Sequence, residues 1–149
     1  MIERQKFCIV QLGDYSLGFD VQFVRSVHES TALTPLPIPM PFVMGVLNLR
    51  GQVISLFNTF DICKLPPKQL TTNKRKTFLF LECTRGKGGL LIDQIDDVIE
   101  VNVSELHPPQ SNFNPSLRTF VSSILKYQNR LVLVLDFEKI YDVICGAKL

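Results

Sequence analysis

The chain has 149 residues, of which 46% are hydrophobic and 20% are charged. This length fits one compact domain or two very small ones, and the composition is too apolar for a disordered chain. The net charge is only +2, from sixteen basic and fourteen acidic residues, so the chain lacks the basic balance typical of nucleic-acid-binding proteins.

The first half of the sequence predicts short strands separated by tight turns. We expect these strands at Phe7–Leu12, Tyr15–Phe19, Arg25–Ser30, Gly45–Leu49 and Gln52–Phe57. Asp20 is expected to cap a brief helical turn, and Asn58 a short helix that ends near Lys64. Four prolines between Pro35 and Pro41 indicate a stiff extended connection, which favours a spacer over a ligand for proline-recognition domains.

The second half repeats this plan after a polar segment, 68–76, that we interpret as a solvated linker. Strands are expected at Thr77–Cys83, Leu90–Ile92, Val98–Val101, Leu117–Tyr127 and Arg130–Leu135. We expect Arg85–Gly89 to form a glycine-rich hairpin turn, with an acidic turn before Val98. Gln128-Asn129 should form another tight turn, and Asp136 should cap a C-terminal helix through about Ile144.

An internal repeat underlies this similarity. Residues 42–62 read FVMGVLNLRGQVISLFNTFDI and align without a gap on residues 120–140, which read FVSSILKYQNRLVLVLDFEKI. The apolar positions coincide, Gly51 falls on Asn129, and Asn58 falls on Asp136. Glycine and asparagine both tolerate positive φ, so a turn residue and a capping residue keep their places. We interpret the chain as a duplicated β unit.

A weaker similarity pairs Leu17–Asp20 with Leu90–Asp93, in the same order along the two halves. The approximate repeats are 7–67 and 77–145. Because units of roughly 70 residues bury too little surface to be stable alone, the two halves are expected to share one core, with the eleven Phe supplying much of its bulk. Many short strands joined by tight turns indicate small barrels, which remove exposed sheet edges.

The sequence carries no pattern that predicts an enzyme, a cofactor or a metal site. His28 and His107 lie in no metal-ligand spacing, and the four cysteines form no C-x-x-C pair. The segment Gly86–Gly89 lacks the spacing of a phosphate-binding loop. Asp93, Asp96, Asp97 and Glu100 miss the calcium-loop spacing, and we favour a solvated face over a cation site.

The N-terminal residues lack an apolar signal region, and no apolar run approaches the length of a membrane span. Cysteines in apolar strand runs, such as Cys8 and Cys83, are expected to be reduced core residues. We therefore expect a soluble cytoplasmic protein that does not insert into a membrane.

Arg50 is the strongest candidate for a binding residue. The duplicate has Gln128 at this position, so the hairpin does not need arginine for its fold. A guanidinium on an exposed turn can bind a carboxylate through two parallel hydrogen bonds, which lysine cannot do. A solvated turn arginine without a partner is the alternative, and it has about equal weight from physical chemistry alone.

Three ordered marks resemble the CheW-like coupling domain of bacterial chemotaxis, over about 7–141 of the chain. They are Gly45–Gly51 followed by Val53-Ile54, then Gly89–Asp93 leading to Val98, and finally Leu133–Asp136 before a helix. The resemblance implies a mainly β fold of two five-stranded SH3-like barrel subdomains with a shared core, short helices and a C-terminal helix. It implies a single domain over 1–149.

The same resemblance implies a non-enzymatic adaptor. Such domains connect the cytoplasmic helices of chemoreceptors to the regulatory domain of a CheA-type histidine kinase, and they are recruited to receptor arrays at the inner membrane. The groove between the barrels is the expected receptor site, and the barrel ends and edge strands are the expected kinase sites. The residues expected to bind partners are Ser26, His28, Asn48, Arg50, Gly51 and Phe60.

This chain departs from the common family pattern at several positions. Ser55, Asn58 and Thr59-Phe60 stand where proline, aspartate and Leu-Arg are usual, and Ser26 stands where many members carry an acid. Asn58 can still cap a helix. The alternatives are therefore a divergent CheW-like scaffold of a gliding or twitching array, or a stand-alone β-barrel module that binds a small ligand or nucleic acid.

Overall fold

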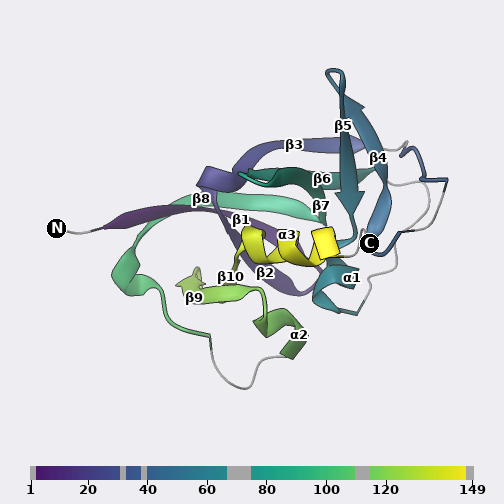
Figure 1. The fold of residues 1–149 in the computed structure, drawn as a ribbon. Helices are drawn as coiled ribbons and strands as arrows, with labels where there is room; N and C mark the ends of the chain where they lie inside the picture. The colour runs from purple at the N-terminus through teal and green to yellow at the C-terminus, as the bar shows by residue number, and fades with distance from the viewer. Residues whose placement is uncertain (1–2, 31–32, 38–39, 67–74, 110–114, 147–149) are drawn as a thin grey trace.

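The computed structural model describes residues 3–30, 33–37, 40–66, 75–109 and 115–146. Within these ranges the chain is mainly β, with short helical segments and a C-terminal helix (Figure 1). The elements of the first half are β1 Arg4–Leu12, β2 Tyr15–Asp20, η1 Val21–Phe23, β3 Val24–Ser30, β4 Val43–Leu49, β5 Gln52–Phe57 and α1 Thr59–Cys63. Those of the second half are β6 Lys76–Cys83, β7 Gly86–Ile92, β8 Gln94–Asn102, η2 Val103–Glu105, α2 Pro115–Arg118, β9 Val121–Tyr127, β10 Arg130–Leu135 and α3 Phe137–Gly146.

The strands form two five-stranded sheets, each an SH3-like barrel as predicted. The first barrel has the order β8-β1-β2-β10-β9, and the second has the order β3-β6-β7-β5-β4. Each barrel takes strands from both halves of the chain, because the hairpin β1–β2 lies between β8 and β10, and the hairpin β6–β7 lies between β3 and β5. Parallel pairing joins β2 to β10 and β7 to β5. The two halves are thus interlocked by exchanged hairpins.

The repeated segments 42–62 and 120–140 carry the same elements at the same positions, as predicted. The hairpin β4–β5 followed by α1 corresponds residue by residue to β9–β10 followed by α3. Each hairpin has an irregular pairing at its base, where Val43 faces Phe57 and Val121 faces Leu135. Each also closes with a backbone hydrogen bond of 2.8 Å from the helix-capping residue to the phenylalanine at the start of the segment.

The weaker repeat predicted from the sequence was out of register by two residues. The sheet pairing places Gly18 opposite Val134 and Gly89 opposite Leu56, and Leu56 and Val134 are equivalent positions. Gly18 therefore corresponds to Gly89, not to Leu91. A Cβ on Gly89 would lie 2.6 Å from Leu56 Cδ2, so a side chain has no room where the parallel strands meet.

Three other expectations are corrected by the structure. The turn before β7 lies at Thr84-Arg85, and the glycines predicted to form it belong to the strand itself. The predicted acidic turn is part of β8, which begins at Gln94. Leu117 lies in α2 rather than in a strand, because Pro115 starts a helical turn and Leu117 packs into the core. Most of the predicted linker at 68–76, together with Pro39, lies outside the described residues.

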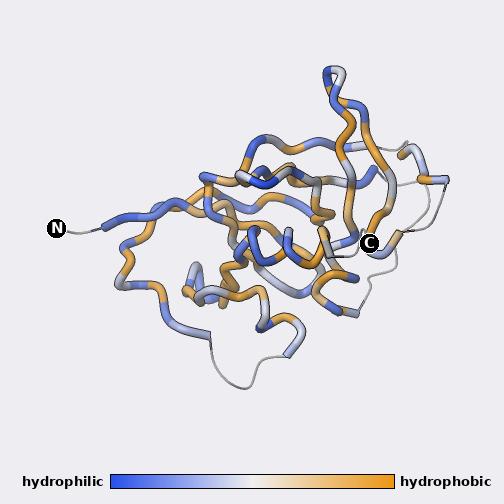
Figure 2. The backbone as a smooth tube through the Cα atoms, viewed as in Figure 1, coloured by the Kyte–Doolittle hydropathy of each residue, from blue (hydrophilic) through white to orange (hydrophobic). Residues whose placement is uncertain are grey.

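The main hydrophobic core is shared by both barrels. It includes strand residues of each sheet and one face of α3, which lies between the barrels in Figure 1. Phe19, Phe78 and Phe137 are among its largest fully buried side chains, and Phe7 is equally buried in a smaller cluster within the first barrel. Full burial of one such ring contributes about 1.5–3 kcal/mol. Hydrophobic residues are spread along the strands of both barrels in Figure 2, while the tip of the β4–β5 hairpin is hydrophilic. Phenylalanine therefore supplies much of the core's bulk, as predicted.

Candidate functional site

The hairpin β4–β5 presents Arg50 on a two-residue turn. Leu49 pairs with Gln52, and both residues between them have positive φ, 52° at Arg50 and 83° at Gly51. Positive φ at both positions is the conformation of a type I′ turn, whose backbone twist matches that of the flanking strands. The hairpin extends away from the rest of the second barrel in Figure 1, and Arg50 is exposed at its tip.

Two hydrogen bonds hold this turn. The Gly51 N–H donates to Asn48 Oδ1 at 3.2 Å, and Lys87 Nζ on β7 donates to Gln52 Oε1. Among the described residues the Arg50 guanidinium makes no hydrogen bond and no ion pair. Asn48 and Gly51 thus shape the backbone, and Arg50 is left available to a partner.

The equivalent turn in the first barrel has the same backbone but different surroundings. Gln128 and Asn129 have φ of 48° and 60°. Beside this turn, Tyr127 Oη donates to Asp97 Oδ2, and Arg130 bonds Asp96 Oδ2 at 3.1 Å. The hydrogen bond to Asp97 raises the pKa of the Tyr127 hydroxyl. Side chains tie both turns to neighbouring strands, but only the turn of the second barrel carries a cation, Arg50, that has no hydrogen bond or ion pair among the described residues.

Ser26 and His28 lie together on β3, at the edge of the second barrel. His28 Nε2 is 3.0 Å from Ser26 Oγ, and the imidazole packs against the Phe80 ring with centroids 4.8 Å apart. Both residues are half-buried. Phe80 and Ile9 are equivalent positions, because they pair with the equivalent glycines Gly89 and Gly18. Ser26 pairs with Phe80 and Asp97 pairs with Ile9, so Ser26 is equivalent to Asp97. The structure brings Ser26 and His28 together, but within the described residues it gives neither of them a bond to Arg50.

Phe60 does not lie at a surface. It is 2% exposed in α1, where its ring packs into the main core. A Cβ built on Gly13 would lie 3.3 Å from Phe60 Cε1, which shows how closely the chain covers this ring. Phe60 is therefore left out of the candidate surface.

Val53 and Lys87 are surface residues beside the tip that sequence reasoning missed. Val53 pairs with Asn48 and is 66% exposed, the largest value among the exposed large apolar residues of the described chain. Its duplicate Leu131 is also exposed, at 47%. An apolar residue in a strand run normally indicates the core, so no sequence pattern marks Val53 or Leu131 as exposed. We define the tip surface as Asn48, Arg50, Gly51, Val53 and Lys87.

The described residues include no group of three or more histidine, cysteine or acidic side chains placed to hold a metal ion. Burial raises the pKa of the Cys63 thiol to about 12 and also raises that of Cys8. These thiols stay protonated at neutral pH and are poor nucleophiles. Within the described ranges no helix has the length and apolar character needed to cross a membrane.

The fold and the site together define a duplicated two-barrel β protein with an exposed, charged hairpin tip. An exposed arginine beside apolar surface is the kind of feature that protein interfaces use. The family model for the CheW-like domain matches residues 6–145. The chain therefore belongs to the CheW-like domain family, which comprises scaffold and adaptor proteins of chemotaxis.

Individual relatives agree with this assignment. The chemotaxis protein CheW of Thermotoga maritima is 27% identical over 134 residues, which cover 90% of this chain and 85% of the relative. Protein FrzA of Myxococcus xanthus is 30% identical over 108 residues, covering 72% of this chain and 65% of FrzA. The crystal structure of the scaffolding protein TtCheW from Thermoanaerobacter tengcongensis shares the fold, with a TM-score of 0.77, 21% identity and 90% of each chain covered.

Proposed function

We propose that this protein is a non-enzymatic adaptor that couples the cytoplasmic helices of chemoreceptors to the regulatory domain of a CheA-type histidine kinase. In this proposal it works in the cytoplasm, in receptor arrays at the inner membrane. Family membership supports the adaptor class, and the partners and the location are inferred from the resemblance.

The observation that carries the proposal is the free Arg50 at the tip of the second barrel. Its backbone lies in the left-handed region, which costs a residue with a Cβ about 1–2 kcal/mol. The duplicated turn carries Gln128 in the same conformation, so the fold does not require a positive charge there. An exposed guanidinium beside an apolar Val53 has the chemistry of an interface arginine, which binds a carboxylate while its neighbour excludes water.

The kinase regulatory domain is the partner that we assign to the tip surface and to the edge strand β3, which carries Ser26 and His28. The receptor helices are assigned to the region between the barrels. Ser26 stands where many family members have an acid, and the chain therefore offers its kinase one negative charge fewer on β3. A divergent pathway with a matching kinase is the second candidate, and this missing charge favours it.

A titration tests the proposal. The purified chain is mixed with the regulatory domain of the CheA-type kinase from the same genome, and separately with a soluble receptor tip. Saturable binding to both, and a complex of all three on gel filtration, are expected. If the chain binds neither fragment but binds nucleic acid with a steep dependence on salt, the adaptor proposal is wrong.

A further inference from the structure

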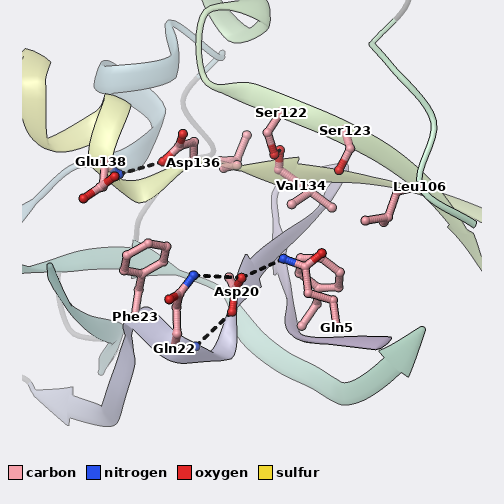
Figure 3. Close-up of a pocket in the computed structure, with 12 residues that line it drawn as sticks. Gln5, Asp20, Gln22, Phe23, Leu106, Ser122, Ser123, Val134, Asp136 and Glu138 are labelled. Carbon is pink, nitrogen blue, oxygen red and sulfur yellow. Dashed lines mark hydrogen bonds between the residues drawn. The ribbon is translucent and has the colours of Figure 1, made fainter. Parts of the chain in front are cut away.

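A cavity of about 300 Å³ lies at the end of the first barrel that is remote from its β9–β10 turn. It is bounded by the start of β1, the end of β2, η1, and the junction of β10 with α3 (Figure 3). Phe7, Phe23, Leu106 and Val134 form apolar parts of the wall. The volume is at the lower limit for ligand pockets, so it suits one side chain or a small molecule.

The polar part of the wall is acidic. Asp20, Asp136 and Glu138 line the cavity, and none of its twelve lining residues is lysine, arginine or histidine. Ser122, Ser123, Gln5 and Gln22 supply the other polar groups. The cavity therefore combines an apolar wall with three carboxylates and no cation of its own.

Two of the carboxylates are held in place by neutral donors. Asp20 accepts hydrogen bonds from the backbone N–H of Gln22 at 3.0 Å and from the side-chain amides of Gln22 and Gln5 at 3.1 and 2.9 Å, as Figure 3 shows. Asp136 caps α3 by accepting from the Glu138 N–H at 2.9 Å. Neutral donors orient a carboxylate but leave its charge in place, so both groups keep the ability to bind a cation.

Glu138 has no such structural task. Its backbone carbonyl accepts from Arg85 Nη2 at 2.8 Å, but within the described residues its carboxylate makes no hydrogen bond and no ion pair. Arg85 itself is bonded to Asp142, outside the cavity wall, and its guanidinium also interacts electrostatically with Glu138. Glu138 therefore contributes to this wall a carboxylate that no hydrogen bond holds.

The second barrel shows that the fold does not need this acidic wall. Sheet register and the repeat place Leu91 at the position of Asp20, Asn58 at that of Asp136 and Phe60 at that of Glu138. Leu91 and Phe60 are each 2% exposed and fill the corresponding space with apolar side chains. Asn58 performs the same capping as Asp136 without a charge, since its Oδ1 accepts from the Phe60 N–H at 3.0 Å. All three negative charges are thus specific to the first barrel.

We propose that this cavity binds a guanidinium or primary ammonium group carried on a short alkyl chain. The cation pairs with the carboxylates of Glu138, Asp20 and Asp136, and the alkyl chain packs on Phe23 and Leu106. A charged group and an apolar stem on one ligand match the two parts of the wall, as lysine and arginine side chains do. The ligand is either a basic side chain of a partner polypeptide or a free alkyl amine. This site shares no residue with the tip surface, so either proposal can fail without the other.

The test is a nuclear magnetic resonance titration of the full ¹⁵N-labelled chain with butylguanidine, and with butylurea as an uncharged analogue. Saturable shifts of the Gln22, Ser123 and Glu138 amides are expected with butylguanidine alone. A Gly-Gly-Arg-Gly-Gly peptide separates the sources. Tighter binding of the peptide supports a partner's side chain, and equal binding supports a small amine.

Charge-neutral variants locate the site. Glu138→Gln combined with Asp136→Asn should weaken binding by about tenfold or more, because two charge-assisted contacts are lost. Asparagine preserves the cap, as Asn58 shows, and Glu138→Gln alone changes only an exposed side chain if the double variant folds poorly. Glu100→Gln on β8 is the control matched to Glu138→Gln alone, since it removes one charge from the same barrel outside the cavity. Equal weakening by Glu100→Gln, or no saturable shift with either cationic probe, would overturn the proposal.

Discussion

Arg50 and Gln128 occupy the same position in two equivalent type I′ turns, with φ of 52° and 48°. Neither is a residue that this conformation favours, and the chain accepts the strain in both barrels. One position carries a charge and the other does not. Comparing the two residues therefore separates the backbone conformation, which both turns require, from the positive charge, which only the turn of the second barrel carries.

The first prediction uses this pair. Arg50→Glu should change the free energy of unfolding by less than about 0.5 kcal/mol, because the side chain is exposed. It should weaken binding to the kinase regulatory domain by roughly 2 kcal/mol or more, because the charge of an interface arginine is reversed. The measurements are thermal unfolding and isothermal titration.

Gln128→Glu is the matched control and should leave the same binding nearly unchanged. Small and equal effects of the two substitutions on every partner would show that Arg50 is only a solvated turn residue. A large loss of thermal stability in Arg50→Glu would instead assign the side chain to the fold.

A second prediction concerns Gly51, which has a φ of 83° and no atom within 4 Å of a built Cβ. Gly51→Ala should lower the free energy of unfolding by about 1–2 kcal/mol, entirely through backbone strain. Asn129→Gly at the duplicate turn should cost nothing or stabilise slightly, because it relieves the same strain. Chemical denaturation measures both, and an unchanged midpoint in Gly51→Ala would contradict the left-handed assignment.

Gly89 provides the opposite test, since its φ is ordinary and its surroundings are full. A Cβ there would lie 2.6 Å from Leu56 Cδ2 and 2.7 Å from Phe80 Cε1. Gly89→Ala should destabilise the protein by about 1–3 kcal/mol through overpacking. A Leu56→Ala background should reduce this cost, because the nearest atom is then gone. Additive effects in the double variant would show that the two positions do not touch.

A fourth prediction concerns the residues that cap the two equivalent helices, Asn58 and Asp136. Asn58 Oδ1 accepts from the backbone N–H groups of Phe60 and Asp61, at 3.0 and 3.4 Å. Asn58→Ala should cost about 1 kcal/mol in unfolding free energy, and Asn58→Asp should cost little, because aspartate already caps the equivalent helix at position 136. Equal stability of the Ala and Asp variants, measured by urea denaturation, would show that the cap is not used.

Cys63 predicts a pH dependence. Burial disfavours the thiolate and raises the folded pKa of this thiol from its ordinary value of 9.0 to about 12. Well below pH 9 the thiol is protonated in both states, and its contribution to stability is constant. As pH rises toward 12 the unfolded chain loses this proton first, so the free energy of unfolding should fall, by up to about 1.4 kcal/mol per pH unit. Urea denaturation at pH 8 and pH 10 measures this fall in the wild type, and in Cys63→Ala the fall should be smaller because the ionisable thiol is gone.

The strands and turns of the hairpins were predictable because their conformation depends on residues close together in the sequence. Gly51, Asn129, Asn58 and Asp136 satisfy a turn or a cap through their own side chains or backbone, and these places were predicted correctly. The glycines before Leu90 were misread as a turn because glycine in a turn and glycine at a close strand contact look the same in sequence. Only the tertiary pairing of β7 with β5 distinguishes the two.

The candidate surface was partly predictable for a similar reason. Arg50 was found because the duplicate lacks the charge, which is a comparison that the sequence itself contains. Phe60 was proposed because it differs from the family pattern, but its burial depends on the packing of α1 into the shared core. The cavity beside Glu138 was not predicted, since its wall joins residues from both ends of the chain.

The exchange of hairpins between the two barrels has a consequence for synthesis on the ribosome. β1 and β2 are translated before every other strand of the described chain, but their partners β8 and β10 follow only after β3 to β7. The first barrel therefore cannot close until β10 has left the ribosome, and until then the apolar faces of β1 and β2 lack their final neighbours.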